Sequence, residues 1–362
     1  MAQQYTYVTS EQERNARHAE RAAARKKKQQ AKRLKRLKQL FPVGAFLLLL
    51  AGLGILWYTQ SNAPEPEVEP EASLPTVSMP ELDPGELPDY TYSAMKTETT
   101  VQLGETTDSS YVVLVDVTSG TILAEKDAHT VMNPASMTKV LTLLVAAEHI
   151  TDLDATVTIT REITDFCFVN GCSIVGFEVG EIVTVRDLLY GTILSSGADA
   201  SLALANHVAG YHESFVELMN EKLAVLGLSE TAHFTNCVGL YEENHACTIY
   251  DMAMIMKAAM ENNLCREVLN TRIYQIPPTN MHPEGQNLSN LFLRRIEDRF
   301  TGEFQIVGGK TGYVAASGSC AVSCGQAADG RLFICATGDA SGPWPVIYDH
   351  TDIYRAYCEK ES

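Results

Sequence analysis

A long uncharged apolar run near the beginning of the chain limits what the rest of the chain can fold into. No charged residue occurs between Gln39 and Ala63, and most of residues 41–60 are apolar. In a helix that rises about 1.5 Å per residue, such a run can just cross the hydrocarbon core of a bilayer. The sequence therefore predicts one N-terminal transmembrane helix over residues 41–60, with separate segments before and after it.

The two sides of this run differ in charge. Residues 1–40 hold 12 Lys/Arg and 3 Asp/Glu, whereas the rest of the chain holds 16 Lys/Arg and 42 Asp/Glu. A basic segment beside an apolar span stays on the cytoplasmic side and contacts anionic lipid, while Trp57 and Tyr58 suit the far interface. We therefore expect a basic cytoplasmic tail over residues 1–40, contact with membrane lipid, and an extracytoplasmic position for the chain after the span.

Two other interpretations of this region are weaker. Basic clusters also bind nucleic acid, but this one stops at the apolar run, so we expect no nucleic-acid partner. Ser61-Asn62-Ala63 is a passable cleavage site for a signal peptide. However, a long segment precedes the run, and the run is longer than a usual signal core. The sequence thus favours an uncleaved single-pass anchor in the cell membrane.

Residues 61–90 have the composition of a spacer. They hold 7 of the 14 prolines and 8 acidic residues, without Lys or Arg. A segment of this kind buries too little apolar surface to offset its ordering entropy, and proline with repelling charge keeps it extended. We expect a linker over residues 61–90 and one globular domain over residues 91–362.

The globular part alternates between strand and helix patterns. Residues 111–117 resemble a buried strand, and residues 121–125 resemble its partner across a Gly-containing turn, which predicts a hairpin. Helices are expected near residues 136–147, 186–190, 201–212, 213–226 and 251–261, and residues 331–336 return to a strand pattern. Strands near both ends with helices between them predict an α/β domain of the α+β type, in which an antiparallel sheet packs on helices.

The stretch Asn133–Lys139 contains a possible nucleophile and base. Pro134 suits a helix entry, and Ser136 and Lys139 are three residues apart, so they share one helical face. A buried lysine near a helix N-terminus has a lowered pKa, because desolvation and the helix dipole both oppose its charge. The neutral amine can accept the proton of Ser136 and make it nucleophilic. Alone, Ser-x-x-Lys is weak, since most such matches are ordinary helix starts.

Two further motifs give this pair its meaning. Ser196-Gly197 follows an apolar helical segment, and Lys310-Thr311-Gly312 lies ahead of the last strand pattern. The order Ser-x-x-Lys, Ser-Gly-x and Lys-Thr-Gly is the set found in penicillin-binding proteins and class A β-lactamases. Three short motifs in that order are far more specific than any one of them.

With these motifs, the chain resembles the serine-type D-alanyl-D-alanine carboxypeptidases, the low-molecular-mass penicillin-binding proteins. The resemblance covers residues 111–338 and rests on these pieces: Pro134–Lys139, Gly180-Glu181, Val185–Leu189, His233–Asn236, Gly239-Leu240, His245 and Thr248–Asp251. It implies a β-lactamase/transpeptidase-like fold with helices on both sides of the sheet. It also implies removal of the terminal D-alanine from peptidoglycan stem peptides, inhibition by β-lactam antibiotics, and no cofactor or metal.

The resemblance implies roles for three catalytic residues. Ser136 attacks the carbonyl between two D-alanines and forms an acyl-enzyme, with Lys139 as its base. Ser196 lies between Ser136 and Lys310 and relays a proton to the leaving amine.

The Lys-Thr-Gly strand is expected to bind the substrate. By resemblance, Lys310 supplies positive charge for the terminal carboxylate, and the Thr311 hydroxyl donates a hydrogen bond to it. Gly312 lets the substrate backbone approach the strand. The backbone N–H of Tyr313, with that of Ser136, forms the oxyanion hole.

The sequence departs from the family pattern at position 198. The middle motif usually continues with Asn, and here it has Ala198. This motivates one alternative, a non-catalytic peptidoglycan-binding relative. The other alternative is a β-lactamase, which needs a Glu-x-x-x-Asn pattern. Glu267 and Asn270 are three residues apart, so that pattern is not met.

Several polar residues have a structural interpretation. We expect Asp199 to cap the helix that follows it, and His233 and His245 to pack rather than to catalyse. The nine cysteines all lie in the exported part, where the close pairs Cys167/Cys172 and Cys237/Cys247 are compatible with disulfides without fixing the connectivity. No paired Cys-x-x-Cys or His-x-x-x-His spacing supports a zinc site.

Overall fold

The computed structural model describes residues 92–299 and 304–358. They belong to the second of two units into which the chain divides, Asp83–Ser362. The expected tail (1–40), transmembrane helix (41–60) and linker (61–90) lie outside the described residues. Across the part of the chain that is described, no helix is both long and apolar enough to cross a bilayer.

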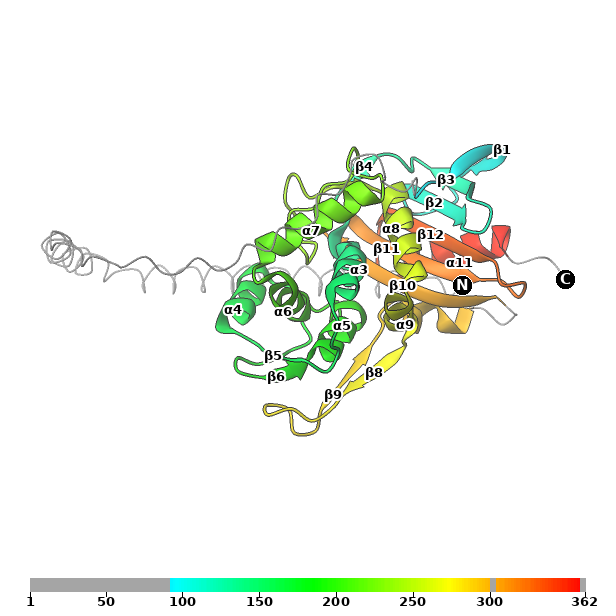
Figure 1. The fold of residues 1–362 in the computed structure, drawn as a ribbon. Coiled ribbons are helices and arrows are strands. Elements are labelled where there is room, and N and C mark those ends of the chain that lie inside the picture. Colours follow the sequence, from blue (N-terminus) through cyan, green and yellow to red (C-terminus); the bar gives the residue numbers. More distant parts are fainter. Residues whose placement is uncertain (1–91, 300–303, 359–362) are drawn as a thin grey trace, which may run out of the picture. The chain divides into compact units, whose positions relative to one another are not determined.

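A six-stranded sheet forms the centre of the domain, with the strand order β1-β3-β2-β12-β11-β10 (Figure 1). All neighbouring pairs are antiparallel except β1 with β3. Three two-stranded ribbons, β4-β7, β5-β6 and β8-β9, lie outside it. The strands are β1 (Met95–Gln102), β2 (Tyr111–Asp116), β3 (Thr121–Lys126), β4 (Val131–Met132), β5 (Thr156–Thr158), β6 (Ile182–Thr184), β7 (Cys247–Thr248), β8 (Ile273–Ile276), β9 (Gln286–Ser289), β10 (Gln305–Val314), β11 (Gly318–Gln326) and β12 (Leu332–Ala340).

Most helices lie between β4 and β10 in the sequence. The short 3₁₀ helix η1 leads directly into α3, which carries the continuous apolar run after Ser136. Thr184 and Thr248 begin α5 and α8 with capping boxes. The helices are η1 (Ala135–Met137), α3 (Thr138–His149), α4 (Arg161–Asn170), α5 (Val185–Leu194), α6 (Ala198–Ala209), α7 (His212–Val225), α8 (Ile249–Glu261), α9 (Asn263–Asn270), α10 (Leu293–Ile296), η2 (Glu297–Arg299) and α11 (Pro345–Tyr357).

Both faces of the sheet are buried. Successive side chains of a strand point to opposite sides, so neighbouring residues of β2 pack into two different cores. Val113 and Val115 of β2 belong to the larger apolar core, which includes α3 and α8. Val112 and Leu114 belong to the smaller core, which includes α11. Figure 1 shows α8 and α11 on opposite sides of the sheet. The expected sheet with helices on both sides is therefore confirmed.

The expected hairpin is also confirmed, as β2 and β3. Asp116 accepts hydrogen bonds at its carboxylate from the N–H groups of Thr118 and Ser119, and Gly120 takes the positive φ that the turn needs. The expectation of a purely antiparallel sheet is wrong at one edge. Residues 95–102 form β1 parallel to β3, although almost all of its side chains are exposed. This strand buries no face and so carries no apolar alternation that a sequence pattern would reveal.

Candidate active site

Ser136 lies in a tight turn between β4 and α3. Asn133 Oδ1 accepts the N–H of Ala135 at 2.9 Å, and Ala135 has φ +48°, a strained value for a residue with a side chain. Gly239 packs behind the turn, where an added Cβ would lie 2.0 Å from the Ala135 carbonyl oxygen. Two backbone segments in contact thus hold the Ser136 hydroxyl at the start of α3.

Lys139 is brought next to Ser136, as the spacing predicts. Its side chain is 2% exposed, and its Nζ lies 3.1 Å from Ser136 Oγ and 2.5 Å from the Val238 carbonyl oxygen. Within the described part of the chain, no carboxylate forms an ion pair with this amine. Burial therefore dominates and lowers the pKa of Lys139 to about 8. At pH 7 the amine is then mostly protonated, and about a tenth of it is neutral.

Ser196 and Lys310 meet across the domain. Lys310 Nζ donates to Ser196 Oγ at 2.9 Å and to the Thr311 carbonyl oxygen at 2.7 Å. Both side chains are buried, and burial together with the charge of Lys139 holds the pKa of Lys310 well below its usual value. Ser196 itself, the second residue after α5, has φ +55° and lies in the left-handed region. The three motifs are therefore brought together in space.

Gly312 has a different local reason from the expected one. A Cβ at this position would lie 2.7 Å from Cys320 Sγ and 3.1 Å from both Ala135 Cβ and the Pro134 carbonyl oxygen. The glycine lets the edge strand β10 press against the turn that carries the nucleophile. Its demonstrated contact is thus with the protein itself, and any contact with substrate backbone remains a prediction.

A cleft of about 620 Å³ opens beside these residues. Ser136, Ser196 and Thr311 line it, and Tyr313 lies at its edge with 68% of its surface exposed. The amines of Lys139 and Lys310 do not line it. The other lining residues are Gly171, Ser173, Leu291, Arg295, Gly312, Ser319, Cys320, Ser341, Gly342, Pro343 and Val346. Ser173 and Arg295 were not expected from the sequence, since no motif or periodicity marks either position.

Asp199 supports the loop that borders the cleft. Its carboxylate accepts hydrogen bonds from the N–H groups of Val175, Gly176 and Phe177 at 2.9–3.2 Å. The expected helix cap is wrong, because the N-cap of α6 is Gly197 and makes no side-chain cap bond. The carboxylate binds the three loop donors and also accepts the N–H of Ala200, in the first turn of α6, at 2.9 Å.

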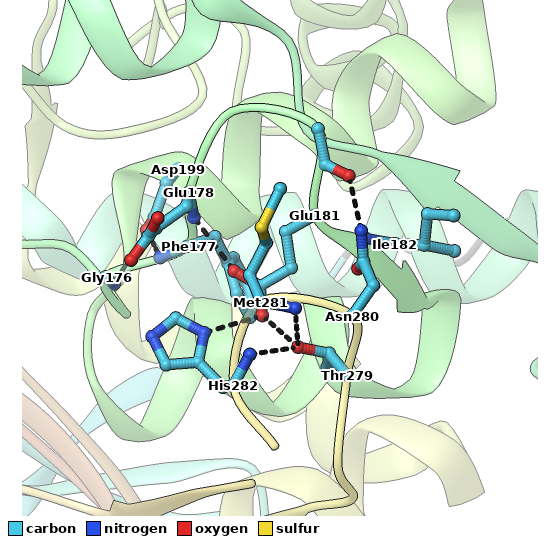
Figure 2. A network of polar contacts seen from close by, with 11 residues as sticks. Gly176, Phe177, Glu178, Glu181, Ile182, Asp199, Thr279, Asn280, Met281 and His282 are labelled. Carbon is cyan, nitrogen blue, oxygen red and sulfur yellow. Dashed lines mark hydrogen bonds and ion pairs between the residues drawn. The ribbon is translucent and has the colours of Figure 1, made fainter.

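Glu181 connects the same loop to the β8-β9 hairpin (Figure 2). Its buried carboxylate accepts from Thr279 Oγ1 at 2.7 Å, from His282 Nδ1 at 2.9 Å and from the Glu178 N–H at 2.8 Å. Asn280 adds two bonds, accepting from the Ile182 N–H and donating to the Gly180 carbonyl, each at 2.9 Å. The loop behind the cleft is therefore fixed from two directions.

Histidine 245 is structural, as expected. The Thr235 N–H donates to His245 Nδ1, so the Nε2–H donates to Thr138 Oγ1 at 2.8 Å. Burial lowers the pKa of His245 to about 3, which keeps the ring neutral. A neutral, fully bonded ring behind α3 holds the helix start and does not line the cleft.

The carboxylate that the β-lactamase alternative would require is engaged elsewhere. Glu267 accepts the hydroxyl of Tyr190 at 2.7 Å, and Tyr190 stacks on Tyr274. Among the described residues that line the cleft, none is Asp or Glu. The described part of the site therefore shows no carboxylate that could act as a second base for deacylation.

Among the described cysteines, only Cys320 lines the cleft. Among the described residues, the close pairs Cys167/Cys172 and Cys237/Cys247 form no disulfide, and the side chains of Cys167 and Cys172 are in hydrogen-bond contact. In residues 92–299 and 304–358, no group of three or more His, Cys, Asp or Glu side chains is placed to hold a metal ion. The polar side chains that line the cleft are instead hydroxyls, one thiol and one guanidinium among the described residues.

Several known proteins are similar to this chain in sequence and in fold. The family described as D-alanyl-D-alanine carboxypeptidase matches residues 96–340. The D-alanyl-D-alanine carboxypeptidase DacC of Escherichia coli is 31% identical over 252 residues, an alignment that covers 66% of this chain and 58% of that protein. DacB2 of Mycobacterium tuberculosis is 34% identical over 226 residues, covering 61% of this chain and 72% of that protein.

Solved structures agree. The crystal structure of a Streptomyces DD-transpeptidase superposes with a TM-score of 0.64 at 28% identity, covering 70% of this chain and 98% of that chain. A D-alanyl-D-alanine carboxypeptidase from Mycobacterium tuberculosis superposes with a TM-score of 0.61 at 29% identity, covering 72% and 96%. The chain spans only 39% of the Bacillus subtilis relative DacF and 58% of DacC. Because the family match nevertheless extends over more than half of the chain, this protein belongs to the D-alanyl-D-alanine carboxypeptidase family.

Proposed function

We propose that this protein is a serine D,D-carboxypeptidase that removes the terminal D-alanine from peptidoglycan stem peptides, and that β-lactams acylate it. The observation that carries the proposal is the Lys139 amine, which lies 3.1 Å from Ser136 Oγ with a pKa lowered to about 8. A hydroxyl beside an amine that is partly neutral near pH 7 is an activated nucleophile. The family match and the named relatives support the same reaction.

Acylation begins with proton transfer inside the turn. Lys139 takes the proton of Ser136 as its oxygen attacks the carbonyl of the penultimate D-alanine. The backbone N–H groups of Ser136 and Tyr313 stabilise the oxyanion that forms, a contribution of roughly 3–4 kcal/mol per donor in other enzymes. The strain at Ala135 fits a backbone held in place for this task.

The leaving D-alanine needs a proton at its nitrogen. Ser196 Oγ lines the cleft and accepts a hydrogen bond from Lys310, so its own proton can point toward the leaving amine. Lys310 then restores that proton from behind. The Thr311 hydroxyl, in the same cleft, binds the carboxylate of the departing residue. The proton that Lys139 took from Ser136 must pass to solvent or to the deprotonated Lys310, and Lys139 can then accept a proton from the water that releases the acyl group.

The two alternatives are not favoured. A β-lactamase would need a carboxylate near the acyl bond, and Glu267 is bonded to Tyr190 away from the cleft. A non-catalytic relative is motivated by Ala198, which is buried at the start of α6. However, the nucleophile, its base and the Ser196–Lys310 pair are all present and in contact.

The same proposal places the protein at the cell surface. The basic tail, the apolar run and the Pro/Glu-rich linker support a single-pass membrane protein with a cytoplasmic N-terminus and an extracytoplasmic catalytic domain. Protease accessibility in intact cells and spheroplasts tests this topology. Protection of the catalytic domain in spheroplasts would contradict it.

The reaction is tested with the full-length protein in detergent. A pentapeptide ending in D-Ala-D-Ala is incubated with the protein, and released D-alanine is measured alongside covalent labelling by a fluorescent penicillin. We expect release and labelling from the native protein and neither from the Ser136→Ala variant. Release that persists in Ser136→Ala would overturn the mechanism, and an acyl-enzyme lifetime of about a second or less would favour a β-lactamase.

A further inference from the structure

The cleft contains one charged side chain, and it is not a motif lysine. Among the described residues that line the cleft, only Arg295 carries a charge. The proposed substrate ends in a carboxylate, which must leave water when it enters such a site. Burying an anion without a cationic partner is costly, so the site needs positive charge at the position that the carboxylate reaches.

Lys310 is poorly placed to provide that charge directly. The residue is 2% exposed, and its amine already donates to Ser196 Oγ and to the Thr311 carbonyl oxygen. A further bond to the substrate would require the amine to leave one of these partners. Its position behind Ser196 suits proton transfer better than contact with a ligand in the cleft.

Arg295 has the opposite properties. It extends from α10, it is half-buried, and no hydrogen bond or ion pair engages its guanidinium among the residues that the structure describes. Burial and the neighbouring Arg294 lower the pKa of Arg295, but a guanidinium remains charged in proteins. Arg295 is thus a partly buried cation that lines the cleft and has no hydrogen-bond or ion-pair partner among the described residues. A cation in this position is suited to bind an anion.

An aromatic ring restricts where this guanidinium can lie. The carbon Cζ of Arg295 is 5.9 Å from the centre of the Trp344 ring, and Cζ of Arg299 is 5.8 Å from the same ring. Arginine stacks on aromatic faces while its N–H fork stays available for a carboxylate. Trp344 follows Pro343, which itself lines the cleft.

We propose that Arg295 binds the terminal carboxylate of the substrate, and of β-lactams, directly. This inference rests on the proposed function and names the group that recognises the free chain end. Thr311 adds a hydroxyl from β10, so the carboxylate is held between the edge strand and α10. Lys310 acts through Ser196. The planar fork of Arg295 can bind the two carboxylate oxygens through two parallel N–H···O bonds, a geometry that a lysine ammonium group does not provide.

The test compares two peptides on the full-length protein in detergent. One ends in D-Ala-D-Ala with a free carboxylate, and the other carries a C-terminal carboxamide. We expect Arg295→Gln to lower kcat/KM for the acid roughly 10- to 100-fold and to leave the amide unchanged. Arg295→Lys should recover part of the loss. The matched control is Arg294→Gln on the same helix, which is exposed and outside the cleft, and it should leave both peptides unchanged.

Three results would overturn the inference. Arg295→Gln could keep the native preference for the acid. It could instead lose both peptides equally, which would indicate a structural role. Arg294→Gln could show the same selective loss, which would indicate a general effect of surface charge. Thermal unfolding of each variant shows whether the fold is retained.

Equilibrium binding separates this inference from the proposed reaction. In the Ser136→Ala background, calorimetry measures affinity for the acid and amide peptides without turnover. We expect the acid to bind more tightly, and Arg295→Gln to remove that difference. If native protein releases no D-alanine, the proposed function fails while this comparison still reports on Arg295. Equal binding of the two peptides to Ser136→Ala, or binding of neither, contradicts the role of Arg295.

Discussion

The amine of Lys139 lies 3.1 Å from the hydroxyl of Ser136, and no carboxylate among the described residues pairs with it. Ion pairing would keep the lysine protonated and useless as a base. Burial without a counter-ion does the opposite and shifts it toward the free amine. Lys139 can therefore act as the base for Ser136 for two reasons: the two residues are three apart on one helical turn, and no carboxylate among the described residues pairs with the amine.

The first prediction concerns pH. Because Lys139 must be neutral to accept the proton, acylation by penicillin should rise with pH and level off above about 8. Below that value the rate should fall by about tenfold per pH unit, in proportion to the free amine. Lys139→Arg should lower the rate about 10²- to 10⁴-fold, since a guanidinium cannot act as the base. Stopped-flow labelling across this pH range measures both effects.

The control for this pH profile is Lys222→Arg. It changes a lysine on α7 that forms an ion pair with Glu148 of α3. Its profile should match that of the native protein. A native rate that is flat from pH 6 to pH 9 would show that Lys139 is not the titrating base.

The second prediction concerns Gly312. In Gly312→Ala, the new Cβ would meet Cys320 Sγ at 2.7 Å and should push β10 away from the nucleophile turn. Overpacking of this kind costs about 1–3 kcal/mol in the free energy of unfolding, and penicillin acylation should slow as well. Urea unfolding and labelling kinetics measure the two effects.

Two comparisons sharpen the prediction at Gly312. Adding Cys320→Ala should recover part of the stability, because it removes the atom in closest contact. Gly104→Ala serves as the matched control, since nothing lies within 4 Å of a Cβ there. If Gly312→Ala is as stable and as reactive as Gly104→Ala, the close approach of β10 to the turn is not required.

The third prediction concerns the loop behind the cleft. Asp199→Asn keeps the size of the side chain but replaces one acceptor of the three loop N–H groups with a donor. Leaving buried N–H groups unpaired should cost about 1–3 kcal/mol and loosen the loop. Hydrogen exchange at residues 175–177 should speed up before the rest of the domain. Unchanged protection there would show that Asp199 does not hold the loop.

The fourth prediction concerns stability in mild acid. Burial lowers the pKa of His350 to about 3, while Ser323 and Thr337 bond its two ring nitrogens. The unfolded chain binds a proton at this residue below pH 6.5, and the folded protein does not. The free energy of unfolding should thus fall as pH drops from about 6.5 toward 3, by up to about 1.4 kcal/mol per unit.

The buried His245 adds a similar slope, since burial lowers its pKa to about 3 as well. His350→Gln should therefore remove only part of the pH dependence, which urea unfolding between pH 7 and pH 5 measures. An equal slope in the native protein and in His350→Gln would mean that His350 titrates alike in the folded and unfolded states.

Local spacing predicted some of these features well, and distance explains the failures. Ser136 and Lys139 meet because one turn of helix places them together, whatever the rest of the chain does. Asp199 was expected to cap its own helix, but its carboxylate accepts hydrogen bonds from the backbone N–H groups of residues 175–177. These contacts are tertiary, so no pattern near Asp199 reveals them.

Arg295 shows a second kind of failure. It lies in a short polar segment without periodicity, and only the folded chain brings it to the cleft. The resemblance to the family implied that Ser196 lies between Ser136 and Lys310, and the structure brings Ser196 and Lys310 into contact although 114 residues separate them. The spacing could not show that Lys310 would be enclosed by that contact.

The parallel strand β1 and the substrate-side strand β10 form opposite edges of the central sheet. Residue 92 continues directly into β1, so any mechanical load arriving from earlier in the chain reaches the sheet at that edge. Such a load would first shear the pairing of β1 with β3, leaving four strands between it and β10. We therefore expect tension applied from the N-terminal side to disturb β1 before it disturbs β10, the edge strand that lines the cleft.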